Sequence, residues 1–210
     1  MKSILASVCL LFLFLFTASV AGLDRDQLNT HWEWIRESPS EWSLEDGVLR
    51  FRTQPDRIWA GSGSRNLLVA KKPFPEKAAA VADVELVEAI NEFEQCGLLV
   101  YEHDDAFVKL ILEHIDGLHY VVMAWEGKGE GKVIAKIEVP ASRVELKYEV
   151  DGSQVTGFWR LPGKTDWNKA AECASPTSNP PRFALFTQDG PREEKRWALV
   201  RKLEWEAGLR

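Results

Sequence analysis

Apolar and polar residues alternate along much of the chain, with the period of two that is typical of half-buried β-strands. The alternation is clear in the segments 48–53, 132–139 and 143–150. Turn-forming pairs such as Asp151-Gly152 separate these segments. The pattern predicts roughly twelve short strands, no helix longer than a turn or two, and one all-β sandwich of two antiparallel sheets.

The stretch from Glu94 to Leu112 differs from these strands because it is apolar on both faces. It predicts two strands joined by an acidic turn at 103–105. In the second strand, the residues that alternate between the two sides are Val108, Leu110 and Leu112 on one and Phe107, Lys109 and Ile111 on the other. A hairpin of this kind belongs in the middle of a sheet with other residues packed over it. We therefore expect it to be the central scaffold.

Three other segments carry weaker patterns. Residues 24–30 show little periodicity and predict a short lead-in, and the proline-rich segment 161–181 predicts a long loop. Residues 195–206 predict the closing strand. The residues expected to share one face of this last strand are Trp197, Leu199, Leu203 and Trp205.

Residues 1–21 have the pattern of a signal peptide. Lys2 supplies the positive end, residues 4–16 the apolar run, and Ser19-Val20-Ala21 the small-x-small cleavage site. The apolar run is too short to favour a membrane span. We therefore expect a secreted or periplasmic protein, with residues 22–210 as a single domain that does not insert into a membrane after cleavage.

Charge and aromatic content narrow the choice of partner. The formal net charge of −6 argues against nucleic acid and anionic membranes, because both favour a basic surface. The chain has nine tryptophans, all of them after residue 21. Most are expected in the core, although tryptophan also stacks on sugar rings.

Two cysteines follow the cleavage site. In an oxidising compartment Cys96 and Cys173 could pair and close a long loop. Alternatively, Cys96 is a buried thiol at the start of a strand. The sequence leaves both readings open.

Several stretches together resemble a known family. They are the residues 42–49, 66–68, 95–101 and 104–110, the pair Asp151-Gly152 followed by Trp159, and the closing Ala198-Leu199-Val200. Their order and spacing are similar to the concanavalin A-like (laminin G-like) jelly roll, specifically the beta-xylosidase C-terminal domain and its relatives of unknown function. The resemblance implies a secreted or periplasmic module that binds glycans or assists glycoside hydrolases. We expect this chain to act as the module alone.

Catalytic and metal-binding patterns are weak. Concanavalin A-like glucanases carry Glu-x-Asp-x-x-Glu, and in the closest stretch, 102–107, Phe107 replaces the second glutamate. We therefore assign no catalytic residue. Asp104 and Asp105, with His103 and either His114 or His119, could form a metal cluster. A solvated turn is the simpler interpretation, so we expect no cofactor, with a structural calcium as the alternative.

Sugar binding needs an apolar platform flanked by groups that hydrogen-bond to hydroxyls. The candidates expected on the face opposite the core are Trp59, Phe107, Lys109, His119, Trp125 and Trp159. The resulting hypothesis is a carbohydrate-binding or glycan-associated module without its own catalysis, whose partner is a glycan or polysaccharide. Two alternatives stay open, a glycoside-processing enzyme of the same fold and a structural or interaction module of the cell surface. The enzyme would need carboxylates converging in a cleft with His103 or His119.

Overall fold

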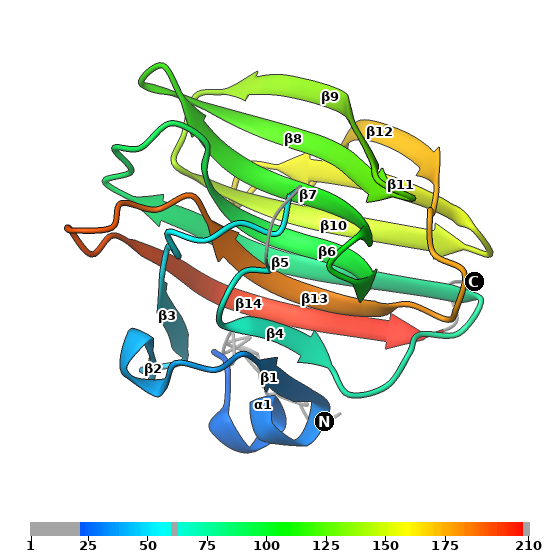
Figure 1. Ribbon diagram of the computed structural model, residues 1–210, viewed down its shortest axis with the longest axis horizontal. Coiled ribbons are helices and arrows are strands. Elements are labelled where there is room, and N and C mark those ends of the chain that lie inside the picture. Colours follow the sequence, from blue (N-terminus) through cyan, green and yellow to red (C-terminus); the bar gives the residue numbers. More distant parts are fainter. Residues whose placement is uncertain (1–21, 60–62, 208–210) are drawn as a thin grey trace, which may run out of the picture.

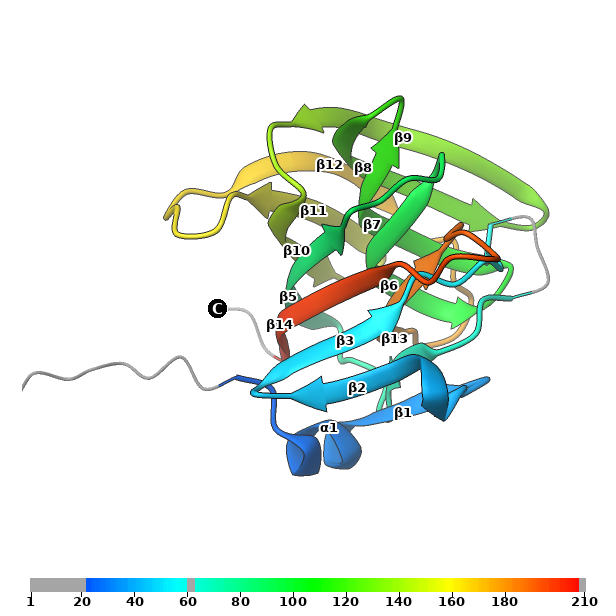
Figure 2. The same ribbon diagram turned by 90° about the vertical axis from the view of Figure 1, so that its left-hand side faces the viewer.

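The structure is a computed structural model that describes residues 22–59 and 63–207. The predicted signal peptide lies outside these residues. Within them the chain forms fourteen strands, arranged as two sheets of seven antiparallel strands (Figure 1). The two sheets pack face to face, as the view in Figure 2 also shows. The predicted all-β jelly-roll sandwich is confirmed.

The strand order defines the two sheets. Sheet A runs β1 (Trp32–Ile35), β4 (Leu67–Ala70), β13 (Arg182–Gln188), β6 (Glu94–His103), β7 (Ala106–Ile115), β8 (Leu118–Gly127), β9 (Glu130–Val139). Sheet B runs β12 (Asn168–Ala174), β11 (Gln154–Arg160), β10 (Arg143–Asp151), β5 (Lys77–Val87), β14 (Trp197–Ala207), β3 (Val48–Arg52), β2 (Trp42–Glu45). A short 3-10 helix, Pro39–Glu41, precedes β2.

A single α-helix, α1 (Arg25–His31), is present in the described part of the chain. It occupies the segment where the sequence predicted a lead-in without periodicity. Asp24 caps it by accepting a hydrogen bond from the backbone N–H of Asp26, and Leu28 anchors it in the core. No helix among the described residues is long and apolar enough to cross a membrane.

The hairpin of β6 and β7 occupies the middle of sheet A, as predicted. Its turn lies at Asp104-Asp105. On the side that faces sheet B, Val108, Leu110 and Leu112 are completely buried in the core between the sheets. Each fully buried aliphatic side chain of this size contributes about 1.5–3 kcal/mol by leaving water.

A second apolar layer covers the other side of the same hairpin. The loop between β3 and β4 places Ile58 and Trp59 over the outer face of sheet A. Beneath them lie Leu99, Phe107 and Ile111, all completely buried. The hairpin is therefore apolar on both faces because both faces are covered.

Two strand predictions were wrong. The expected long loop 161–181 contains β12, the edge strand of sheet B, whose side chains are mostly exposed. In β14 a bulge lies between Val200 and Lys202. The extra residue reverses which positions face inward, because side chains alternate with a period of two. Before the bulge, Ala198 and Val200 are buried in the core instead of Trp197 and Leu199, whereas after it Leu203 and Trp205 face the core as predicted.

The two cysteines do not form a disulfide. Cys96 is completely buried in the centre of sheet A, and Cys173 lies on the edge strand β12 of sheet B. Burial raises the pKa of the Cys173 thiol to about 11 and raises the pKa of the Cys96 thiol further. Pairing is therefore the wrong reading, and Cys96 is a buried thiol of the core.

Gly97 is the point on β6 where a side chain would do most damage. A methyl group there would lie 2.4 Å from the carbonyl oxygen of Leu110 and 2.6 Å from Cα of Ile111. Both atoms belong to the backbone of β7 and cannot move alone. We expect Gly97→Ala to lower the free energy of unfolding by about 1–3 kcal/mol, measured by urea denaturation.

Gly157→Ala is the matched control for this prediction. Its methyl group would meet the sulfur of Met123 at 2.9 Å and a Leu110 methyl at 3.2 Å. Both contacts are ends of flexible side chains, so the loss should be smaller. Equal stability losses in the two variants would contradict this account of Gly97.

Candidate functional site

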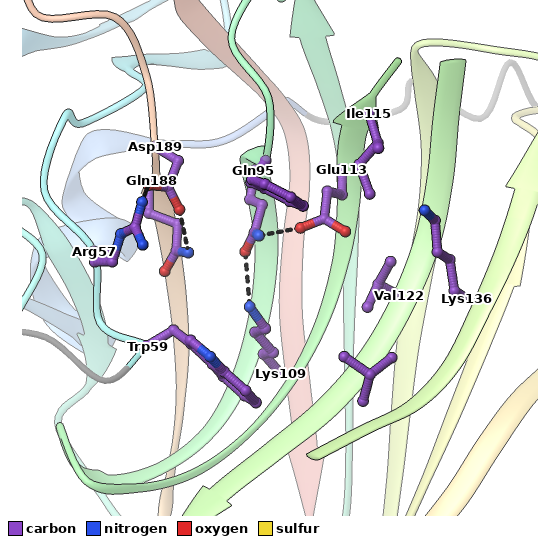
Figure 3. A pocket seen from close by; sticks show the side chains of 12 residues that line it. Arg57, Trp59, Gln95, Lys109, Glu113, Ile115, Val122, Lys136, Gln188 and Asp189 are labelled. Carbon is purple, nitrogen blue, oxygen red and sulfur yellow. Dashed lines mark hydrogen bonds and ion pairs between the residues drawn. The ribbon is translucent and has the colours of Figure 1, made fainter. Parts of the chain in front are cut away.

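A cavity of about 350 Å³ lies on the outer face of sheet A, beside the covering loop (Figure 3). It forms where the strands turn alternate side chains away from sheet B. Its lining comprises Arg57, Trp59, Phe93, Gln95, Lys109, Glu113, Ile115, Val122, Val133, Lys136, Gln188 and Asp189. Polar groups from β6, β7 and β13 therefore meet aromatic and aliphatic side chains in one place.

A hydrogen-bonded chain crosses the floor of the cavity. Lys109 Nζ donates to Gln95 Oε1 at 3.0 Å, and Gln95 Nε2 donates to Glu113 Oε1 (Figure 3). Gln95 lies directly opposite Glu113, whereas Lys109 lies opposite Leu99. Between these two positions, Gly97 has no side chain and leaves the path of the lysine open. The Gln95 amide thus bridges the Lys109 amine and the Glu113 carboxylate, which the strand register keeps apart.

These charged groups are largely out of solvent. Lys109 is 5% exposed, and its Nζ lies 4.7 Å from the ring centre of Trp59. Burial lowers the pKa of Lys109 to about 8, although Glu113, Asp189 and Glu126 favour the charged form. Burial also raises the pKa of Glu113, against the opposing influence of Lys109. Protonation of this pair is therefore sensitive to what fills the cavity.

A second polar group closes the cavity at the end of β13. Asp189 Oδ1 lies 2.7 Å from Arg57 Nη2, and Asp189 Oδ2 accepts a hydrogen bond of 2.8 Å from Gln188 Nε2. Gln188 Oε1 accepts the backbone N–H of Ile58 at 3.2 Å. These contacts fasten the covering loop to sheet A. Burial raises the pKa of Asp189, and Arg57 opposes this change.

Three of the six predicted candidates gather at this site. Trp59 and Lys109 line the cavity. Phe107 lies on the same face but is completely buried, and its ring packs edge-on against Trp59 with 6.4 Å between ring centres. Phe107 thus supports Trp59 from below.

The side chains of the other three candidates face away from the cavity. His119, Trp125 and Trp159 were expected on the face opposite the core, but their side chains face the other sheet. Trp125 and Trp159 pack partly buried against the core between the sheets. His119 lies beside His114, with 5.6 Å between ring centres, on the same side of sheet A. In β8 the outward positions are those of Tyr120 and Val122.

The acidic turn is held by protein contacts. Asp104 lies 2.9 Å from Arg36 and accepts a hydrogen bond of 2.8 Å from the hydroxyl of Tyr101. The backbone N–H of Asp105 donates to His103 Nδ1 at 3.2 Å. Within the residues that the structure describes, no cluster of three histidine, cysteine or acidic side chains could hold a metal ion.

The lining residues that the sequence interpretation missed include Gln95, Glu113, Gln188 and Asp189. The sequence carries a signal for two of these four residues. Glu113 shares the parity of Lys109 along β7, and Gln95 is the last polar residue before an apolar run. Gln188 and Asp189 carry no such local signal, because they reach the site through the pairing of β13 with β6.

Comparison with known proteins supports the fold assignment. The profile of the "Beta xylosidase C-terminal Concanavalin A-like domain" matches residues 23–198. The chain belongs to this family. A search of curated protein sequences finds no match.

Solved structures with a similar fold include two Bacillus proteins and a protein of unknown function. The GH43 protein BlXynB of Bacillus licheniformis has 18% identity and a TM-score of 0.74, over 85% of this chain and 37% of its own. The xylan beta-1,4-xylosidase of Bacillus halodurans C-125 has 17% identity and a TM-score of 0.69, over 84% and 37%. A functionally unknown protein from Saccharomyces cerevisiae has 16% identity and a TM-score of 0.66, over 86% and 98%.

The share of each solved structure that this chain covers limits what the similarity says about function. This concanavalin A-like chain spans well under half the length of the two Bacillus proteins. At these identities the likeness shows the fold, and the function has to be argued from the cavity itself.

The lowered pKa of Lys109 predicts how stability depends on pH. Its pKa falls from 10.5 in the unfolded chain to about 8 in the folded one. Between these values only the unfolded chain holds the proton, so stability rises with pH. Relative to Lys109→Met, the native chain should gain about 3 kcal/mol between pH 7 and pH 10.5, measured by urea denaturation.

Lys136→Met is the control, since Lys136 lines the same cavity but is exposed, with its Nζ 4.1 Å from the ring centre of Tyr120. Its stability difference from the native chain should not change over this pH range. A constant difference for Lys109→Met as well would show that Lys109 remains fully charged in the fold.

Proposed function

We propose that this chain is a secreted or periplasmic carbohydrate-binding module without its own catalysis, which holds a sugar in the cavity on sheet A. The observation that carries the proposal is the meeting of an aromatic wall, Trp59, with the hydrogen-bonded chain of Lys109, Gln95 and Glu113 in one cavity. Sugar rings present apolar C–H faces and hydroxyl groups together. A site for them needs both kinds of partner.

The polar groups of the floor have capacity left for hydroxyl groups. Lys109 has three N–H donors, and one hydrogen bond, to Gln95, is found for it among the described residues. Glu113 has two carboxylate oxygens, and its one hydrogen bond there uses Oε1. A donor therefore remains on Lys109 and an acceptor on Glu113, one on each side of Gln95. Adjacent hydroxyls of a sugar, each both donor and acceptor, match this arrangement.

The first ligands to test come from the relatives. The Bacillus halodurans protein is named for xylan, so xylo-oligosaccharides are the first choice within a broader glycan panel. A flat polar face would have favoured the alternative of a structural or interaction module at the cell surface. A hollow with a half-buried tryptophan at its wall supports sugar binding instead.

A glycoside-processing enzyme is the second candidate, because two carboxyl groups with raised pKa line the same cavity. They are Glu113 and Asp189. A general acid for glycoside cleavage needs a carboxyl group of this kind. The histidines proposed to assist such an enzyme lie elsewhere, His103 in the exposed turn and His119 on the core side.

Binding is tested by titration calorimetry of the mature chain with the oligosaccharides selected on a glycan array. We expect Trp59→Ala to weaken binding at least about tenfold, because the aromatic wall is lost. Trp167→Ala is the control, since this half-buried tryptophan stacks on Arg160 at 4.2 Å, away from the cavity. An array without any bound glycan would overturn the proposal.

The same oligosaccharides decide between binding and cleavage. Incubation with the mature chain should release no shorter sugar, as followed by chromatography. Release that disappears in Glu113→Gln would establish the enzyme candidate in place of the binding module.

A further inference from the structure

Exposed apolar side chains collect at the mouth of the cavity. The large apolar side chains that are exposed in the described part of the chain are Ile90, Phe93, Leu118 and Val133. Phe93 and Val133, which are 49% and 55% exposed, both line the cavity although they come from different elements. Single exposed apolar residues need no explanation, but their convergence on one cavity points to a ligand.

The backbone of Phe93 is held in an unfavourable conformation. Its φ is +66°, and it is the only aromatic residue among the eight described non-glycine residues with positive φ. For a bulky side chain this conformation costs about 1–3 kcal/mol and is maintained only where the surroundings enforce it. Contacts with neighbouring residues must therefore hold the backbone of Phe93 in this conformation.

Buried Glu94 enforces this conformation. It is 1% exposed and accepts hydrogen bonds from the Thr53 hydroxyl at 2.5 Å and from the backbone N–H of Ile90 at 3.1 Å. The backbone N–H of Phe93 itself donates to the carbonyl of His114 at 2.9 Å. The loop before β6 is thus fastened on both sides of the residue. The ring of Phe93 is presented at the cavity before any ligand arrives.

The cavity is divided into a polar and an apolar part. Figure 3 shows Arg57, Gln188 and Asp189 on one side of Gln95 and Glu113, and Ile115, Val122 and Lys136 on the other. Ile115 and Val122 offer apolar surface on the second side, beside the amine of Lys136, and the exposed Phe93 and Val133 add apolar surface to the lining. A sugar that is polar on all edges would satisfy only the first part.

We propose that the ligand is amphipathic, a glycoside whose sugar contacts Lys109, Gln95 and Glu113 and whose aromatic substituent contacts Phe93 and Val133. This inference rests on the proposed function and specifies its ligand. The cavity of about 350 Å³ is near the lower end of the range of about 300–1,000 Å³ for small-molecule sites. One sugar ring with one aromatic ring suits this size better than a long polysaccharide segment.

The test compares ligands that differ only in the substituent. Binding of 4-nitrophenyl and methyl β-glycosides of xylose, glucose and galactose to the mature chain is measured by titration calorimetry. We expect the nitrophenyl glycoside of the preferred sugar to bind at least about tenfold more tightly than the methyl glycoside. Phe93→Ala should remove most of this preference. Val133→Ser should reduce it.

Ile90→Ala provides a matched control. Ile90 belongs to the same loop and is also 49% exposed, but it does not line the cavity. The preference for the nitrophenyl glycoside should survive in this variant. If Ile90→Ala lost it as completely as Phe93→Ala, the effect would come from the loop and the inference would fall.

The remaining outcomes separate this inference from the proposed function. Equal affinities for methyl and nitrophenyl glycosides would overturn the inference and leave sugar binding intact. No binding of any glycoside, with no bound glycan on the array, would overturn both. Free 4-nitrophenol binding as tightly as its glycoside would overturn the role assigned to the sugar.

Discussion

The packing of Ile58 and Trp59 onto the outer face of the β6–β7 hairpin is the interaction on which the candidate site depends. A hairpin that is apolar on both sides needs a cover on each, and sheet B supplies only one. The second cover is a loop held to β13 by Asp189 and Gln188. Because the loop covers only part of the outer face, the uncovered remainder becomes the cavity.

The polar groups of the cavity follow from the same arrangement. Beside a buried apolar layer, a lysine or a carboxylate is tolerated only when it is hydrogen-bonded or paired. Gln95 satisfies both needs by accepting from Lys109 and donating to Glu113. Gly97 makes this geometry accessible, since any larger residue would meet the backbone of β7. The network thus depends on one amide and on one missing side chain.

Most of the fold was predictable from the period of two and from turn residues. The central hairpin and the sandwich were recognised from local patterns, because side-chain alternation is a property of each strand by itself. β12 was missed because its apolar residues, Ala170, Ala171 and Cys173, are small, only partly buried and do not alternate cleanly with polar ones. The first half of β14 was assigned to the wrong face because a bulge near Val200 adds one residue, and nothing in the local sequence marks it.

The sequence by itself determined which residues share a face, and so it placed Phe107 with Lys109 on β7. Only the tertiary structure decided which face meets the other sheet, since both faces of such strands are apolar. For this reason Trp125 was expected at the site and lies instead against the core between the sheets. The partnership of Arg57 with Asp189, separated by 132 positions, was equally out of reach. Local patterns record alternation along a strand, whereas a cavity depends on long-range packing that brings distant segments together.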